Sequence, residues 1–138
     1  MPTGYWIKGL TEIPRVRDDE QGAPEWYPIQ HHFGLRAFGA NAYVAREAGD
    51  LLIGDHDETG SGQEELYVVL AGQALFELNG ERAEAHAVSV VVVRDPSVRR
   101  RAVASTAGTI VLAIGGRPAD TFTSTWRPEW FADVPRAS

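Results

Sequence analysis

Residues 64–72 read Glu-Glu-Leu-Tyr-Val-Val-Leu-Ala-Gly, and this stretch does most to decide the fold. Its β-branched and aromatic residues are typical of a strand. Alternate residues of a strand point to the same face, so Glu65, Tyr67 and Val69 share one face. Gly72 then permits a sharp turn into the next segment. A carboxylate directed at a protein interior is costly unless it is paired or coordinates a cation, so the pattern predicts a ligand or partner for Glu65.

On both sides of this stretch, short apolar segments alternate with turn residues. The clearest turn is Asn79-Gly80, the preferred two-residue hairpin, which separates two apolar segments. Many short strands with frequent turns predict an all-β sandwich or barrel. The apolar run at 89–93 does not alternate, which predicts a strand covered on both faces. The predicted strands cover residues 29–35, 41–46, 51–55, 66–70, 74–78, 82–85, 89–93, 100–104 and 109–114.

The length of 138 residues suits one domain. The chain divides into an irregular N-terminal arm, a barrel and a C-terminal tail, at residues 1–28, 29–120 and 121–138. Prolines and a glycine interrupt the arm, and its aromatic residues are expected to pin it to the domain or to a second subunit. In the tail, Trp126, Trp130 and Phe131 can share one helical face, which predicts a short C-terminal helix.

Composition excludes several classes of function. A formal net charge of −6 argues against nucleic-acid binding, which needs clustered Lys and Arg. The chain contains no cysteine, so disulfides and thiolate nucleophiles are excluded. No apolar run approaches the roughly 20 residues of a membrane helix, and the N-terminus lacks the pattern of a secretory signal. We therefore expect a cytoplasmic protein without membrane or nucleic-acid partners.

Together with Gly49, the 64–72 stretch resembles the first motif of the cupin superfamily: Gly, five residues, His-x-His, a gap, Glu, six residues and Gly. Glu65 and Gly72 have the required six residues between them. The resemblance covers about residues 49–104. It implies a cupin-type double-stranded β-helix, a jelly-roll barrel, with Glu65 facing the interior. It also implies a homodimer, because cupins commonly dimerise.

The His-x-His part of the motif is altered, and two registers fit it. Counting from the first glycine of the motif gives Asp55 and Asp57, whereas a shift of one residue gives His56 and Glu58. The two pairs point to opposite faces of a strand, so only one pair can face inwards beside Glu65. We favour His56, Glu58 and Glu65 as candidate metal ligands, because neutral imidazole is the commonest transition-metal ligand. The other register offers an all-oxygen set better suited to Mn²⁺, Mg²⁺ or Ca²⁺.

The second cupin motif places its last metal-ligand histidine where this chain has Arg100. A guanidinium cannot coordinate a cation and repels one. It forms bidentate pairs with carboxylates instead, so Arg100 is expected to pair with Glu65 or with an acid group of a ligand. Glu65, Arg100 and Tyr67 are accordingly the candidate ligand-binding residues.

Three hypotheses of function remain, and no residue of the sequence names a substrate or a catalytic group. The favoured one is a cupin domain that binds a small polar or acidic ligand in the barrel without a typical metal triad. The first alternative is a metal-dependent small-molecule enzyme, an oxygenase or isomerase with a divalent ion as cofactor. The second alternative is a dimerisation or protein-docking module, for which the aromatic residues of the arm and tail would supply the contact surface.

Overall fold

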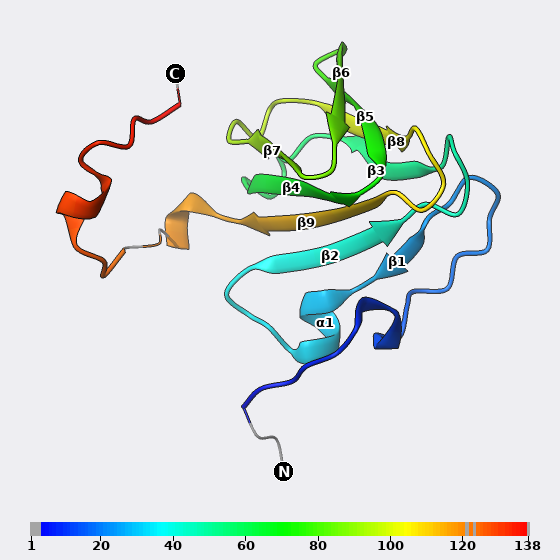
Figure 1. Cartoon of the computed structure of the whole chain (residues 1–138), viewed down its shortest axis with the longest axis horizontal. Coiled ribbons are helices and arrows are strands. Elements are labelled where there is room, and N and C mark those ends of the chain that lie inside the picture. Colours follow the sequence, from blue (N-terminus) through cyan, green and yellow to red (C-terminus); the bar gives the residue numbers. More distant parts are fainter. Residues whose placement is uncertain (1–3, 121, 123, 138) are drawn as a thin grey trace.

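The structure, a computed structural model, describes residues 4–120, 122 and 124–137; the other residues of the predicted arm and tail lie outside the described part. In the described part, the strands form two antiparallel sheets that face each other (Figure 1). The first sheet has the order β1 (Glu25–Tyr27), β2 (Gly39–Val44), β9 (Ile110–Gly116), β4 (Glu64–Ala71) and β7 (Ser89–Val93). The second has the order β3 (Leu51–His56), β8 (Arg100–Ala104), β5 (Gln73–Leu78) and β6 (Glu81–His86). The all-β prediction is confirmed.

The core lies between the two sheets and is built by the alternation along each strand. Tyr67 and Val69 of β4 are buried, as is Val111 of β9 beside them. Phe76 of β5 meets them from the second sheet, with its ring centroid 5.7 Å from that of Tyr67. The strand face that carries Tyr67 and Val69, which was predicted to point inwards, therefore meets the core.

Two turns take the conformations that their residues predict. Asn79 and Gly80 have φ values of 51° and 83°, and join β5 to β6 as a two-residue hairpin. Gly72 has a φ of 75°, and a Cβ at this position would overlap the backbone and side chain of Thr109. Glycine is therefore required at residue 72 both for backbone conformation and for space.

The strand predicted at 29–35 is wrong, because these residues form the helix α1 (Ile29–Phe33). The helix ends at Gly34, whose φ of 68° is left-handed. Ile29 and Phe33 lie one helical turn apart and both pack against a small cluster around Tyr27 and Ala42. The N-terminal arm is also less irregular than predicted, since it contributes β1 and a 3₁₀ turn at Leu10–Glu12.

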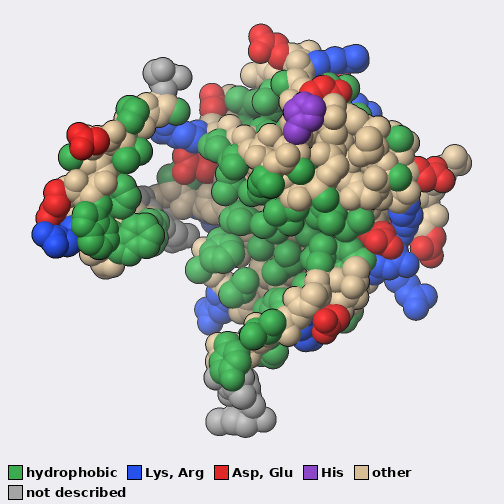
Figure 2. Space-filling view, viewed as in Figure 1, with side chains coloured by type: hydrophobic (Ala, Val, Ile, Leu, Met, Phe, Trp, Pro, Cys, Tyr) green, Lys and Arg blue, Asp and Glu red, His purple; other side chains and the backbone are tan. Residues whose placement is uncertain are grey.

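The strand at Ser89–Val93 has its predicted bounds, but the prediction that both its faces are covered is wrong. Val90 and Val92 are 58% and 59% exposed. The reason is topological: β7 is an edge strand, whereas the arm and α1 cover the sheet over β2 and its neighbour β9. Figure 2 shows hydrophobic side chains gathered around the middle of the face in view, where the first sheet lies.

The C-terminal tail runs away from the two sheets (Figure 1). After a 3₁₀ turn at Pro118–Asp120, the predicted short helix takes the form of one further 3₁₀ turn, Pro128–Phe131. Trp126 stacks on Phe131 with ring centroids 6.1 Å apart, and Trp130 is exposed. No helix in the described ranges is long and apolar enough to cross a membrane.

Candidate functional site

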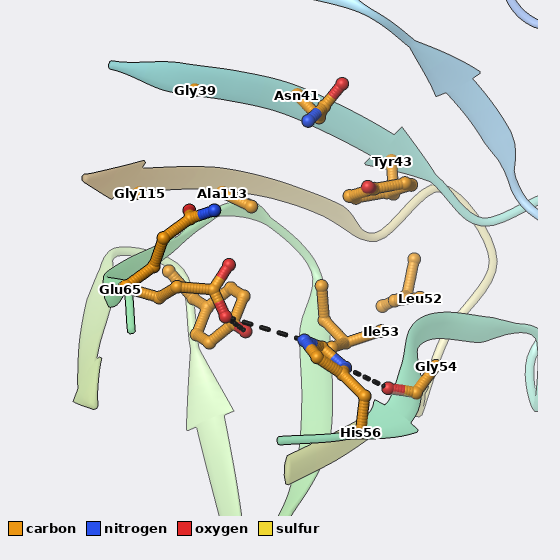
Figure 3. A pocket seen from close by; sticks show the side chains of 12 residues that line it. Gly39, Asn41, Tyr43, Leu52, Ile53, Gly54, His56, Glu65, Ala113 and Gly115 are labelled. Carbon is orange, nitrogen blue, oxygen red and sulfur yellow. Dashed lines mark hydrogen bonds and ion pairs between the residues drawn. The ribbon is translucent and has the colours of Figure 1, made fainter. Parts of the chain in front are cut away.

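A pocket of about 170 Å³ opens between the sheets, at the end of the core nearest Glu65. Strands β2, β3, β4 and β9 supply most of its walls, so residues far apart in sequence meet there (Figure 3). Figure 3 shows His56 of β3 pointing towards Glu65 of β4, with Asn41 and Tyr43 of β2 on the other side. The lining is mostly polar at this mouth, whereas Leu52 and Ile53 close the inner side.

His56 is held in a defined orientation by the backbone. Its Nδ1 lies 2.6 Å from the carbonyl oxygen of Gly54. A carbonyl oxygen only accepts, so Nδ1 carries a proton and donates this bond. The other ring nitrogen, Nε2, lies 3.2 Å from Glu58 Oε2 and 3.6 Å from Glu65 Oε1. Both oxygens are acceptors, so either a proton on Nε2 or a cation must lie between them.

The structure brings His56 and Glu58 to Glu65, and it turns the pair of the other register away. Asp55 forms an ion pair with Arg99 Nε at 2.8 Å. Asp57 accepts hydrogen bonds from the backbone and side chain of Thr59, which lower the pKa of its carboxyl group. The cause is an irregularity in the pairing of β3 with β8, which shifts the register between Ile53 and His56.

Glu65 is hydrogen-bonded on the core side. The Tyr67 hydroxyl donates a 2.6 Å hydrogen bond to Glu65 Oε1. Burial raises the pKa of Tyr67 far above its ordinary value, and the hydrogen bond to the Glu65 carboxylate adds to this effect. Burial, with the charge of Glu65, also raises the pKa of Tyr43. Both phenols therefore remain protonated hydrogen-bond donors at neutral pH.

Arg100 lies behind Glu65 and is wholly buried. Its Nη1 is 3.6 Å from Glu65 Oε1, which is an ion pair beyond hydrogen-bond distance. Among the described residues, none accepts a hydrogen bond from its three guanidinium nitrogens. Arg100 is not part of the pocket wall, so it reaches the pocket only through Glu65.

His56, Glu58 and Glu65 can each offer one ligand atom to a metal ion, and these atoms lie within 4.8 Å of one another. One imidazole nitrogen and two carboxylate oxygens form a donor set that suits a first-row transition metal. The guanidinium of Arg100 beside Glu65 opposes such an ion, because like charges repel strongly in a poorly solvated site.

Sequence reasoning missed several wall residues. Asn41 and Tyr43 lie two positions apart on β2 and so share its pocket face, and Gln63 precedes β4. Asn41 interrupts an otherwise apolar segment, and this polar residue in a predicted strand was the available signal. Gly115 could not have been found in this way: a Cβ there would press on Gln63 and Glu65, which only the β4–β9 register reveals.

No protein-family model matches the chain, and no curated protein matches it in sequence. Solved structures do resemble it. A cupin protein from Bacteroides fragilis matches with a TM-score of 0.62 and 19% identity, over 80% of this chain and 90% of the other. A sugar phosphate isomerase of the cupin superfamily from Silicibacter pomeroyi matches with a TM-score of 0.65 and 16% identity, over 81% and 76%. The nucleoside dehydratase Pac13 from Streptomyces matches with a TM-score of 0.56 and 16% identity, over 80% and 81%. At these identities, the likeness establishes the fold alone.

Proposed function

We propose that this chain, which has the cupin fold, binds a small uncharged ligand rich in hydroxyl groups in the pocket beside Glu65, without a metal ion. The observation that carries the proposal is the arrangement of His56, whose Nε2 is directed at the carboxylates of Glu58 and Glu65 while Gly54 fixes its other nitrogen. An oriented imidazole between carboxylates is suited to hold a proton and transfer it to or from a bound hydroxyl or carbonyl group.

The wall of the pocket supports a polar ligand. Gln63 offers an amide group, Tyr43 a hydroxyl group and Glu65 a carboxylate acceptor. Asn41 offers its amide NH₂ group, because its Oδ1 accepts a hydrogen bond from Trp26 Nε1 at 2.9 Å. The pocket volume of about 170 Å³ equals the liquid volume of about six water molecules, which is room for a small polyol. A few polar groups around an apolar inner wall are typical of small-molecule sites.

The sequence predicts a ligand that is small and either polar or acidic. The charge of the pocket favours an uncharged polar ligand over an acidic one. Glu65 lines the pocket and Glu58 lies beside His56 at its edge, and the pocket wall in the described residues contains no Lys or Arg. Arg100, which was expected to pair with Glu65 or with an acid group of a ligand, lies beside Glu65 and is buried outside the pocket wall. A carboxylate or phosphate ligand would meet repulsion from the two glutamates without a direct cationic partner.

The named activities of two structural neighbours agree with this chemistry. A sugar phosphate isomerase and a nucleoside dehydratase both act on polyhydroxylated molecules. Isomerisation and dehydration of such molecules proceed by proton transfers, for which a histidine flanked by carboxylates is an appropriate group. We extend to this chain a polyhydroxylated ligand and a proton transfer. We do not extend to it the phosphate group named for the isomerase.

A second candidate function, a metal-dependent enzyme, is favoured by one observation: the ligand atoms of His56, Glu58 and Glu65 lie within 4.8 Å of one another. These three residues would hold the ion, and the ion would act as a Lewis acid on the ligand. Arg100 argues against it, because its guanidinium lies 3.6 Å from Glu65, one of the two carboxylate groups among the three ligands.

The test is a thermal-shift screen of tag-free protein in EDTA, with neutral pentoses, polyols and nucleosides beside their phosphorylated or carboxylated analogues. We expect neutral members to raise the melting temperature and their anionic analogues to do so less. Asn41→Ala should remove the shift, whereas Gln21→Ala, outside this pocket, should keep it. Shifts by anionic ligands only, or shifts that Asn41→Ala leaves intact, would overturn the proposal.

A further inference from the structure

We propose that Arg100 is the built-in cation of this site: it supplies the positive charge beside Glu65 that a metal ion would otherwise provide, and thereby keeps divalent cations out. Arg100 is then a positioning residue that acts through Glu65, and it also determines that the pocket works without a metal. The inference rests on the proposed function, because it concerns the same pocket.

The strand pairing places Arg100 at the site. Strand β8 runs antiparallel to β3, and Arg100 is the register partner of His56. Alternation turns Arg100 inwards and its two neighbours outwards. Arg99 and Arg101 pair instead with Asp55 and Glu77 on the outer side. Of the three consecutive arginines, the pairing therefore directs one side chain to the carboxylates of the site.

The surroundings of Arg100 indicate that its positive charge matters at this position more than its packing or its hydrogen bonds. The side chain has no exposed surface, and its three nitrogens have no hydrogen-bond partner among the described residues. A guanidinium stays charged in a protein, and burying it with so few bonds is costly. An apolar side chain would fill the same space without that cost. What the guanidinium adds is a fixed positive charge 3.6 Å from Glu65 Oε1.

This charge balances the acids and opposes a dication. Glu58 and Glu65 bring two negative charges to His56, and a metal ion held by these three residues would share the Glu65 carboxylate with Arg100. Repulsion between a dication and a guanidinium only a few ångströms apart, in a partly desolvated site, weakens metal binding by at least about 100-fold.

The test measures metal affinity by calorimetric titration of tag-free protein with Zn²⁺ and with Mn²⁺ alone. Arg100→Gln removes the charge, Arg100→Lys keeps it, and Arg101→Gln is a matched control on the outer face. We expect Arg100→Gln to bind metal at least about 100-fold more tightly than the wild type, and the other two variants to stay within about threefold of it. Retention by Lys separates a role of the charge from a role in packing.

Two results would overturn the inference: stoichiometric, tight metal binding by the wild type, or equal affinities of the wild type and Arg100→Gln. The first of these is decided on the wild type alone, whether or not Arg100→Gln folds. The ligand screen in EDTA separates this inference from the proposed function. If Arg100→Gln gains metal while no neutral ligand binds the wild type, the charge role stands and the proposed function fails. If neutral ligands bind in EDTA while the wild type and Arg100→Gln have the same affinity for metal, the proposed function stands and the role of the Arg100 charge fails.

Discussion

Replacing Glu65 by Gln tests the ion pair on which the site depends. The substitution keeps the size of the side chain and an acceptor for the Tyr67 hydroxyl, but it leaves the wholly buried Arg100 without a countercharge. At 3.6 Å and an effective dielectric constant of about 20, the lost attraction is about 4 to 5 kcal/mol. Breaking a buried pair by removing one partner costs about 3 to 5 kcal/mol, which agrees with this value. We expect Glu65→Gln to lower the free energy of unfolding by that amount.

Urea denaturation followed by circular dichroism measures the effect, with two comparisons. Glu77→Gln breaks the outer pairs with Arg82 and Arg101 and should cost less than about 1 kcal/mol, because exposed pairs contribute little. Glu65→Gln combined with Arg100→Met removes both charges and should recover at least half of the loss. A cost of Glu65→Gln below about 1 kcal/mol, or a double variant no more stable than the single one, would show that the ion pair does not stabilise the fold.

Three further predictions concern pH, the turn and assembly. The raised pKa of Tyr67 means that the folded state keeps this proton when the unfolded chain has lost it, so stability is complete below pH 10 and falls as pH rises further. Tyr67→Phe should flatten this alkaline loss in melting curves between pH 8 and 11; an unchanged slope would contradict the assignment. Gly72→Ala should destabilise the fold by about 2 to 4 kcal/mol in urea denaturation, because its φ of 75° is strained for Ala and the new Cβ overlaps Thr109; a cost under about 1 kcal/mol would count against this. If the homodimer expected from the sequence forms through the open apolar face of the first sheet, Val92→Lys should shift the mass in solution from dimer to monomer, whereas Leu51→Lys on the second sheet should not. A wild type that is monomeric, or a Val92→Lys variant that stays dimeric, would contradict that interface.

The parts of the fold that could be predicted from sequence are those with local causes. The alternation around Tyr67 fixes which face of β4 meets the core, and Asn79-Gly80 fixes a hairpin, because both effects act within a few residues. The helix α1 was mistaken for a strand because a five-residue apolar segment does not separate the two periods. The spacing of four residues between Ile29 and Phe33 identifies a helix only once the cluster that both side chains pack against is known.

The site was predictable only in part, because its geometry is set by pairing between distant strands. Arg100 was expected to pair with Glu65 or with an acid group of a ligand, and the ion pair with Glu65 agrees with the first alternative. The sequence left the register at 55–58 open, since an irregularity in the pairing of β3 with β8 decides it. Asn41 and Gly115 enter the pocket through the β2–β9–β4 register, which a single sequence does not reveal.

The central claim, a metal-free pocket for an uncharged polar ligand with His56 at its centre, is tested most directly by one calorimetric titration. The neutral ligand that gives the largest thermal shift is titrated into tag-free, EDTA-treated wild type, and into the same protein after addition of Zn²⁺ or Mn²⁺. We expect one-to-one binding in EDTA that the metal does not strengthen, and at least about tenfold weaker binding by His56→Gln. Binding that occurs only after the metal is added would contradict it.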